Sequence, residues 1–272
     1  MQTILGAVNI LLPVAYLLVA VDYGFLFFSA HPVAARTATP ALRGTVLLHL
    51  GFLIGLAFRH NQFPAATVSQ ALSVVSLAVA AVYVFVEWRG RERSTGFWLV
   101  SLVFFFQLLS SLFAQPNPPD RDIFHNAVFA THVSLALLGY AAFVVGAGYA
   151  FLYLQLYRDL KAGRYSTFYG KLPPLAVLER MMLGALRSGF GALTGAVLTG
   201  GFWAYRSGYS LDDPKIFVTL AIWLIYGAAL LLRRLRRWQG RQTALASLAG
   251  LCAILFSLVA VNFFFTGFHR FH

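Results

Sequence analysis

The sequence predicts an all-α protein, a polytopic bundle of about eight transmembrane helices with both termini on the extracytoplasmic side. Of its 272 residues, 59% are apolar and only 11% are charged, and the mean hydropathy is +0.72, far above that of an ordinary soluble domain. The apolar residues form eight runs, each near the roughly 20 residues that cross a hydrocarbon core. Most Lys and Arg residues lie on one side of these runs, which orients the bundle.

The eight runs follow one another along the whole chain. We place the spans at 4–28, 42–58, 66–88, 96–114, 127–156, 188–205, 216–232 and 243–266. Because lipid offers no water to backbone N–H and C=O groups, each run must satisfy them internally as a helix. The runs are too long and too uniformly apolar for barrel strands. No linker divides them, so we expect one transmembrane domain over 1–272, with the first span retained.

The connections between the runs differ in charge. Sixteen of the 21 Lys and Arg residues fall on alternate connections, which the positive-inside rule assigns to the cytoplasm: Arg36, Arg43, Arg89, Arg91, Arg93, Arg158, Lys161, Arg164, Lys171, Arg180, Arg187, Arg233, Arg234, Arg236, Arg237 and Arg241. The other five are Arg59, Arg121, Arg206, Lys215 and Arg270. The net charge of +12 is therefore a signal of topology, and we expect no nucleic-acid partner.

The longest connection, 157–187, contains KLPPLAVLERMMLGALR. Its apolar residues recur at helical spacing after Pro173 and Pro174, which suit the first turn of a helix. These residues are Leu175, Leu178, Met182 and Leu186. The pattern predicts a short amphipathic helix at the inner membrane surface. We interpret it as a structural connector, and the alternative is a docking site for a partner.

Five of the seven histidines fall at the outer membrane boundary: His60, His125, His132, His269 and His272. An interfacial histidine is usually an anchor whose ring reaches water. His132 and His269, however, open the fifth predicted span and close the eighth, so their imidazoles can face each other at one depth. Such a pair suits axial ligation of a haem iron. Because the chain has one cysteine, Cys252, and no CxxCH attachment, the expected cofactor is non-covalent haem b.

Few ionisable residues lie within the spans. His49 lies well inside the second span, and we consider it equally as a metal or haem ligand and as a neutral hydrogen-bonding strut between helices. Asp22 and Glu87 lie near the cytoplasmic ends of their spans, which weakens a proton or ion pump. The chain has no Walker A loop, GxSxG or HExxH, so we expect no bond-making catalysis of its own.

Several segments resemble one known family. They are THVSLALLGYAAFVVGAGYAFLYLQLY from Thr131, KLPPLAVLER from Lys171, GFGALTGAVLTGGFWAY from Gly189, DDPKIFVTLAIWLIYGAALLLR from Asp212, and TGFH from Thr266. In this order and spacing they resemble the cytochrome c assembly family of haem-handling membrane proteins, the CcsA and HemX-like group. The resemblance covers most of the chain from residue 45 onwards.

The resemblance implies an outer haem site. In that family a tryptophan-rich outer segment binds haem between two histidines, which fall here on His132 and His269. The segment itself falls on 203–215, where Trp203, Tyr209 and Asp213 would shape the pocket. The sequence departs from the family pattern: only Trp203 of several tryptophans is kept, Ile216 replaces a glutamate, and the family's inner histidine aligns near Leu231. The short chain looks closer to the HemX-like branch.

The sequence therefore predicts a haem-binding, multi-pass protein of the inner (cytoplasmic) membrane that is an accessory in cytochrome c assembly or haem handling. Its expected partners are other membrane proteins of cytochrome or haem assembly, haem and the lipid bilayer. Two alternatives stay open. One is a cofactor-free structural or assembly subunit of a larger membrane complex that retains the family fold, and the other is a transporter for a small hydrophobic molecule.

Overall fold

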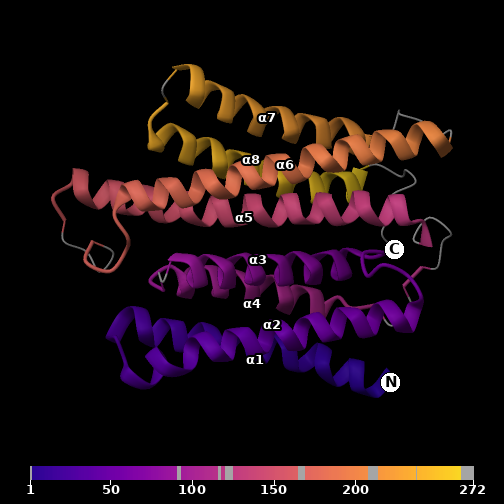
Figure 1. Cartoon of the computed structure of the whole chain (residues 1–272), viewed down its shortest axis with the longest axis horizontal. Helices are drawn as coiled ribbons and strands as arrows, with labels where there is room; N and C mark the ends of the chain where they lie inside the picture. The colour runs from indigo at the N-terminus through magenta and orange to yellow at the C-terminus, as the bar shows by residue number, and fades with distance from the viewer. Residues whose placement is uncertain are drawn as a thin grey trace. The chain divides into compact units, whose positions relative to one another are not determined.

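The chain folds into eight helices, which are seen in a computed structural model that describes residues 2–90, 93–115, 118–119, 125–164, 169–207, 214–236 and 238–264 (Figure 1). Within these ranges there is no strand. The helices are α1 (Gln2–Ser29), α2 (Pro32–His60), α3 (Val68–Gly90), α4 (Gly96–Leu112), α5 (Ala127–Lys161), α6 (Leu175–Ser207), α7 (Pro214–Arg236) and α8 (Gly240–Phe264). The predicted all-α polytopic helical bundle is confirmed.

The helices have the length and surface of membrane spans. Six of them are long and apolar enough to cross a membrane, whereas α4 and the described part of α8 are shorter apolar helices. Large apolar side chains are widely exposed, among them Phe58 at 80%, Ile10 at 70% and Leu224 at 60%. A water-soluble domain would bury many of these side chains, so this surface is suited to contact with lipid.

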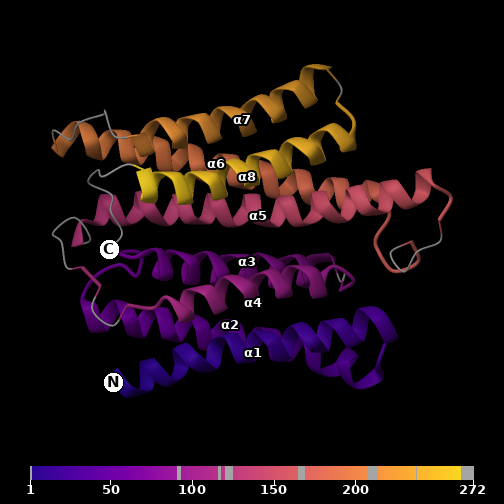
Figure 2. The same ribbon diagram turned by 180° about the vertical axis from the view of Figure 1, so that it is seen from behind.

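The helices group into two compact units. Unit 1 comprises Met1–His125 and Tyr165–Pro173 and contains α1 to α4, and unit 2 comprises Asn126–Arg164 and Pro174–His272 and contains α5 to α8. In unit 1, α1 packs against α2 and α4, and α3 packs against α2 and α4. In unit 2, α5 packs against α6 and α8, and α7 packs against the same two helices (Figure 2). The single domain over 1–272 stays a prediction.

Glycines bring α5 and α6 together. A Cβ atom on Gly139 would lie 3.2 Å from the carbonyl oxygen of Gly189, and a Cβ on Gly189 would lie 2.7 Å from the ring of Phe143. Small residues at such positions let two membrane helices approach backbone to backbone. These contacts lie within the lengths of α5 and α6, away from the ends of both helices.

The predicted boundary between an amphipathic connector and the sixth span is wrong, because Leu175–Ser207 forms one continuous helix. The predicted apolar face is present, with Leu178, Met182 and Leu186 fully buried. It packs within the bundle, where Met182 and Leu186 lie against Gly146 of α5. No proline follows Pro174 in α6, and Gly189 serves close packing rather than a break. Similarly, α2 begins at Pro32, before the predicted start at 42.

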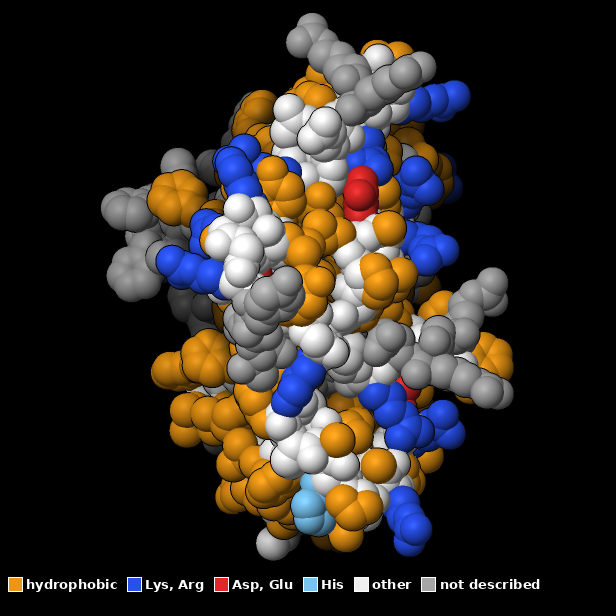
Figure 3. Space-filling view, turned by 90° about the vertical axis from the view of Figure 1, so that its left-hand side faces the viewer, with side chains coloured by type: hydrophobic (Ala, Val, Ile, Leu, Met, Phe, Trp, Pro, Cys, Tyr) orange, Lys and Arg blue, Asp and Glu red, His pale blue; other side chains and the backbone are white. Residues whose placement is uncertain are grey.

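Basic side chains mark one end of the helices in each unit. Figure 3 shows Lys and Arg side chains gathered at this end, with few acidic side chains beside them. Glu87 is buried here and pairs with Arg93, whose Nε lies 3.4 Å from Oε1. Asp22 instead accepts a hydrogen bond from Thr37 Oγ1 at 2.7 Å. Both carboxylates are held by protein groups at the end of the helices that carries the positive charge.

Candidate functional site

The start of α5 is fixed by a side-chain cap. Asn126 precedes the helix, and its side-chain oxygen accepts hydrogen bonds from the backbone N–H groups of Val128 at 2.9 Å and Phe129 at 3.1 Å. Such a cap satisfies two of the first four N–H groups, which have no partner within the helix. It sets the register of the first turns and thereby the directions of Phe129 and His132.

The half-buried ring of His132 points from α5 towards the backbone of α6. Its Nδ1 lies 2.7 Å from the carbonyl oxygen of Ala196. A carbonyl oxygen only accepts, so Nδ1 carries the proton and donates it. In the neutral ring the basic lone pair is then on Nε2, which is the arrangement found in histidines that ligate a metal through one nitrogen and donate the other N–H to a carbonyl. The backbone of α6 therefore selects the tautomer of His132 that is suited to iron.

The ring of His132 also depends on a glycine. A Cβ atom on Gly200 would lie 2.5 Å from Nδ1 and 2.6 Å from Cε1 of His132, so no side chain fits there while the ring stays in place. A Cβ atom on the neighbouring Gly201 would meet no atom within 4 Å. Of these two consecutive glycines, only Gly200 is required by the position of the ring.

Aromatic side chains surround the same end of unit 2. The ring of Phe129 lies 6.3 Å from that of His132 and 5.6 Å from that of Trp203, measured between ring centroids. Phe129 thus lies between His132 and Trp203, the two predicted residues of the outer site that the structure describes. Faces of flat apolar rings beside a histidine are suited to a porphyrin, which needs apolar walls around its iron ligand.

The other predicted residues of this site lie outside the described residues. They are His269, Tyr209 and Asp213. The structure therefore brings together His132 and Trp203 of the predicted set. The pairing of His132 with His269 stays a prediction.

His49 belongs to unit 1 and has a different environment. It is fully buried, and both ring nitrogens have partners: Tyr16 O–H lies 3.0 Å from Nδ1, and Ser73 Oγ lies 2.9 Å from Nε2. Ser73 donates to Gln107 Oε1 at 3.0 Å, and Gln107 Nε2 donates to Ser111 Oγ at 3.2 Å. One hydrogen-bonded chain thus joins α1, α2, α3 and α4.

The far end of this chain fixes its direction. Ser111 Oγ lies 2.8 Å from the carbonyl oxygen of Asn9, and the hydroxyl proton must point there because a carbonyl cannot donate. Ser111 then accepts from the amide nitrogen of Gln107, which leaves the amide oxygen to accept from Ser73. Ser73 in turn accepts from Nε2–H of His49. Nδ1 of His49 is therefore unprotonated and accepts from Tyr16.

This network gives His49 the geometry of a strut. To ligate iron, either nitrogen would have to break a buried hydrogen bond, and Nε2 would also have to lose its proton. The partners Tyr16, Ser73 and Gln107 were not predicted from the sequence. Isolated polar residues within apolar spans were the available signal, because a buried polar group in a membrane needs a partner.

The chain resembles known proteins over most of its length. The profile of the family described as Cytochrome C assembly protein matches residues 41–269. Three similar proteins are each named cytochrome c biogenesis protein CcsA. The protein from Heterosigma akashiwo (strain NIES-293 / 8280G21-1) is 25% identical over 251 residues, which cover 79% of this chain and 78% of the relative.

The other two similar proteins come from Prochlorococcus and Synechococcus strains. The protein from Prochlorococcus marinus (strain MIT 9312) is 26% identical over 259 residues, covering 84% of this chain and 82% of the relative. The protein from Synechococcus sp. (strain CC9605) is 29% identical over 254 residues, covering 83% of each. The family match includes the positions of His49, His132, Trp203 and His269.

Proposed function

The chain belongs to the cytochrome c assembly protein family, and on that premise we propose that it is a haem-binding accessory of cytochrome c assembly or haem handling. The haem is non-covalent haem b, held at the outer face by His132 and His269. Trp203, Tyr209 and Asp213 shape its pocket. The protein is multi-pass and lies in the inner (cytoplasmic) membrane, with other membrane proteins of cytochrome or haem assembly as its partners.

The observation that supports this proposal is the setting of His132. Its Nδ1–H is held by the carbonyl oxygen of Ala196, its ring lies against Gly200, and Phe129 and Trp203 provide flat apolar surfaces beside it. The described half of the site fits a haem ligand that binds through Nε2. Two neutral imidazoles on one iron supply a low-spin centre, whose potential the surrounding residues set.

The chain's own residues account for binding and orientation. The Asn126 cap and the contact with Gly200 fix the position of His132 at the start of α5 before any ligand arrives, which lowers the entropic cost of binding. The apolar rings of Phe129 and Trp203 limit water around the ligand. We assign no bond-making step to this chain.

The test is the reduced-minus-oxidised visible spectrum of the full chain purified in mild detergent. We expect a b-type spectrum in wild type that is lost in both His132→Ala and His269→Ala. His125→Ala is the matched control, because it removes a neighbouring outer histidine that the proposal does not use, and its spectrum is expected to equal that of wild type.

One feature favours the alternative of a cofactor-free assembly subunit with the family fold. Ile216 lies in the first turn of α7, where the resemblance implies a glutamate. If wild type contains no haem even after haem supplementation, the ligand assignment is wrong and this alternative takes its place.

A further inference from the structure

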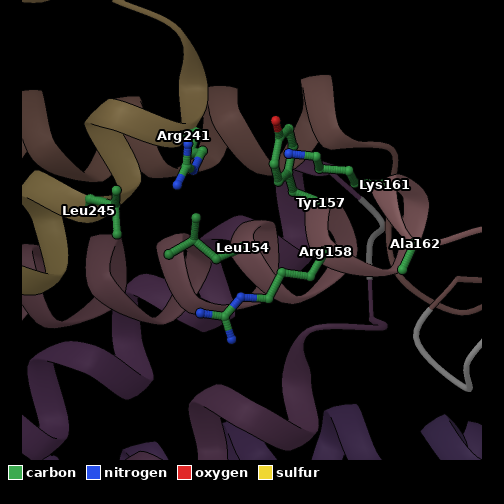
Figure 4. A pocket seen from close by; sticks show the side chains of 7 residues that line it. All are labelled: Leu154, Tyr157, Arg158, Lys161, Ala162, Arg241 and Leu245. Carbon is green, nitrogen blue, oxygen red and sulfur yellow. The ribbon is translucent and has the colours of Figure 1, made fainter. Parts of the chain in front are cut away.

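A cavity of about 340 Å³ lies at the positively charged end of unit 2, between α5 and α8 (Figure 4). The last turns of α5 contribute Leu154, Tyr157, Arg158 and Lys161, and the first turns of α8 contribute Arg241 and Leu245. The haem proposal uses none of these residues. The cavity lies at the opposite end of α5 from His132.

Three cationic side chains line this cavity. Arg158 and Lys161 lie in the last turn of α5, where a positive side chain is favoured by the helix dipole. Arg241 lies in the first turn of α8, where the same effect disfavours a cation and favours an anion. The dipole of its own helix therefore does not favour Arg241 at this position, and a bound anion would offset that cost.

Within the described part of the chain, no carboxylate forms an ion pair with Arg158, Lys161 or Arg241. The ion pairs found there are Glu87 with Arg93 and Glu179 with Arg233. Arg233 shows the contrast, because it also donates to the carbonyl oxygen of Trp238 at 3.1 Å and to Thr243 Oγ1 at 3.3 Å. Arg233 is satisfied by the protein, whereas the three cavity cations are placed to bind an external negative group.

A second cavity, of about 550 Å³ in unit 1, also has two cations in its lining, Arg93 and Lys171. Both are engaged by the protein. Arg93 pairs with Glu87, and Lys171 Nζ donates to the carbonyl oxygen of Phe28 at 2.6 Å. A basic cavity at this end of the helices is thus not sufficient for a binding site, and the α5–α8 cavity is the stronger candidate.

The walls of the α5–α8 cavity indicate an amphiphilic ligand. Leu154 and Leu245 provide apolar surface directly beside the charged groups, and the phenol of Tyr157 adds a polar group. The site lies at the ends of two membrane helices, where headgroups of the bilayer are found. Basic pockets between membrane helices on this side are typical binding sites for anionic lipid headgroups.

We propose that the cavity binds the phosphate headgroup of an anionic phospholipid from the leaflet on the positively charged side. Arg158, Lys161 and Arg241 contact the phosphate, and an acyl chain lies along Leu154 and Leu245. This inference does not rest on haem binding. It adds a specific lipid contact to a protein whose family role concerns cytochrome c assembly.

The test is native mass spectrometry of the full chain with phosphatidylglycerol and, separately, phosphatidylcholine. We expect wild type to retain phosphatidylglycerol preferentially. A triple variant, R158Q with K161Q and R241Q, is expected to bind phosphatidylglycerol roughly 100-fold more weakly, because each cation near an anionic surface contributes about fivefold. Ala162→Glu places a carboxylate in the same lining and is expected to weaken binding without removing any cation.

The matched control is R180Q with R187Q and R234Q. These exposed arginines belong to the same unit and the same charged side, lie outside the cavity lining, and give the same change in net charge. We expect less than about a threefold effect, since only diffuse attraction to the anionic surface is reduced. An equal loss in both triple variants would overturn the proposal in favour of diffuse charge.

Two further outcomes would also overturn it. One is equal retention of phosphatidylglycerol and phosphatidylcholine by wild type. The other is binding of inorganic phosphate in place of lipid, measured as displacement of phosphatidylglycerol at millimolar phosphate, because the ligand would then be a free anion. Persistence of the lipid adduct in millimolar phosphate supports the lipid assignment.

Discussion

His49 and His132 are both histidines of membrane helices, yet their hydrogen bonds select opposite tautomers, with the proton on Nε2 of His49 and on Nδ1 of His132. In unit 1, His49 is fully buried and bonded at both nitrogens, to Tyr16 and Ser73. In unit 2, His132 is half-buried near the start of its helix and donates Nδ1–H to the carbonyl oxygen of Ala196. The difference teaches that the hydrogen-bond partners of a histidine, and not its depth in the membrane alone, decide which ring nitrogen carries the proton.

The largest effect on stability is expected for His49→Ala. The substitution opens a buried space and leaves the Tyr16 hydroxyl without its acceptor, at a cost of about 3 kcal/mol in the free energy of unfolding. Denaturant titration in detergent measures this change. Haem content per folded molecule is expected to stay at the wild-type level. A loss of haem in this variant would instead indicate that His49 ligates the iron.

Thr45→Ala is the control one turn away on α2. Among the residues that the structure describes, its hydroxyl donates to the carbonyl oxygen of Ala41 in the same helix, at 2.9 Å. We expect a cost below about 1 kcal/mol. A cost equal to that of His49→Ala would mean that position in α2, rather than the network, determines the effect.

The next largest effect distinguishes two consecutive glycines of α6. Gly200→Ala forces a methyl group against the ring of His132. Overpacking of about 1–3 kcal/mol is expected to lower haem affinity by about fivefold or more. Gly201→Ala adds the same methyl group in open space and is expected to be neutral or slightly stabilising. Haem titration followed by absorbance compares them, and equal affinities would contradict the position of His132.

A smaller effect tests whether the hydrogen bonds of the network around His49 strengthen one another. Tyr16→Phe and Gln107→Leu each remove one link, at about 1 kcal/mol apiece. The double variant is expected to lose less stability than the two single variants together. The reason is that the hydrogen bonds run in one direction and strengthen one another, so that breaking one already weakens the other. Tyr16→Phe with Thr194→Val is the control pair, since Thr194 accepts from Trp223 Nε1 at 2.8 Å in unit 2. Strict additivity in both pairs would show that the links are independent.

The smallest effect is expected at the helix cap. Asn126→Ala removes the acceptor for two N–H groups at the start of α5 and costs about 1 kcal/mol. Asn126→Asp keeps an acceptor and is expected to be close to wild type. Hydrogen exchange of the first turn of α5 reports the difference, and equal protection in both variants would mean that the cap does not help to position His132.

Much of the fold was predictable because lipid leaves an apolar segment few alternatives to a helix. The eight helices follow the eight apolar runs, and the apolar face of Leu178, Met182 and Leu186 was correctly identified. The surroundings of this face were not predicted correctly, because the same amphipathic pattern suits a helix on the membrane surface and a helix packed in a bundle. The burial of this face and its contact with Gly146 of α5 distinguish the two settings.

The candidate site was predictable in part, for a similar reason. His132 was predicted from its position at the start of a span and from the family resemblance, and Trp203 was predicted from the resemblance alone. The Ala196 carbonyl that orients His132 is a backbone atom, so residue type carries no signal for it. The partners of His49 come from separate helices, and only the fold brings Tyr16, Ser73 and Gln107 together.

The most direct test of the central claim, that His132 ligates an outer haem, is rescue by a small molecule. His132→Gly leaves a space where the imidazole was, and free imidazole can occupy it. We predict that this variant loses the b-type spectrum and regains it with added imidazole, while His125→Gly keeps the spectrum throughout. An unchanged b-type spectrum in His132→Gly without imidazole would contradict the claim.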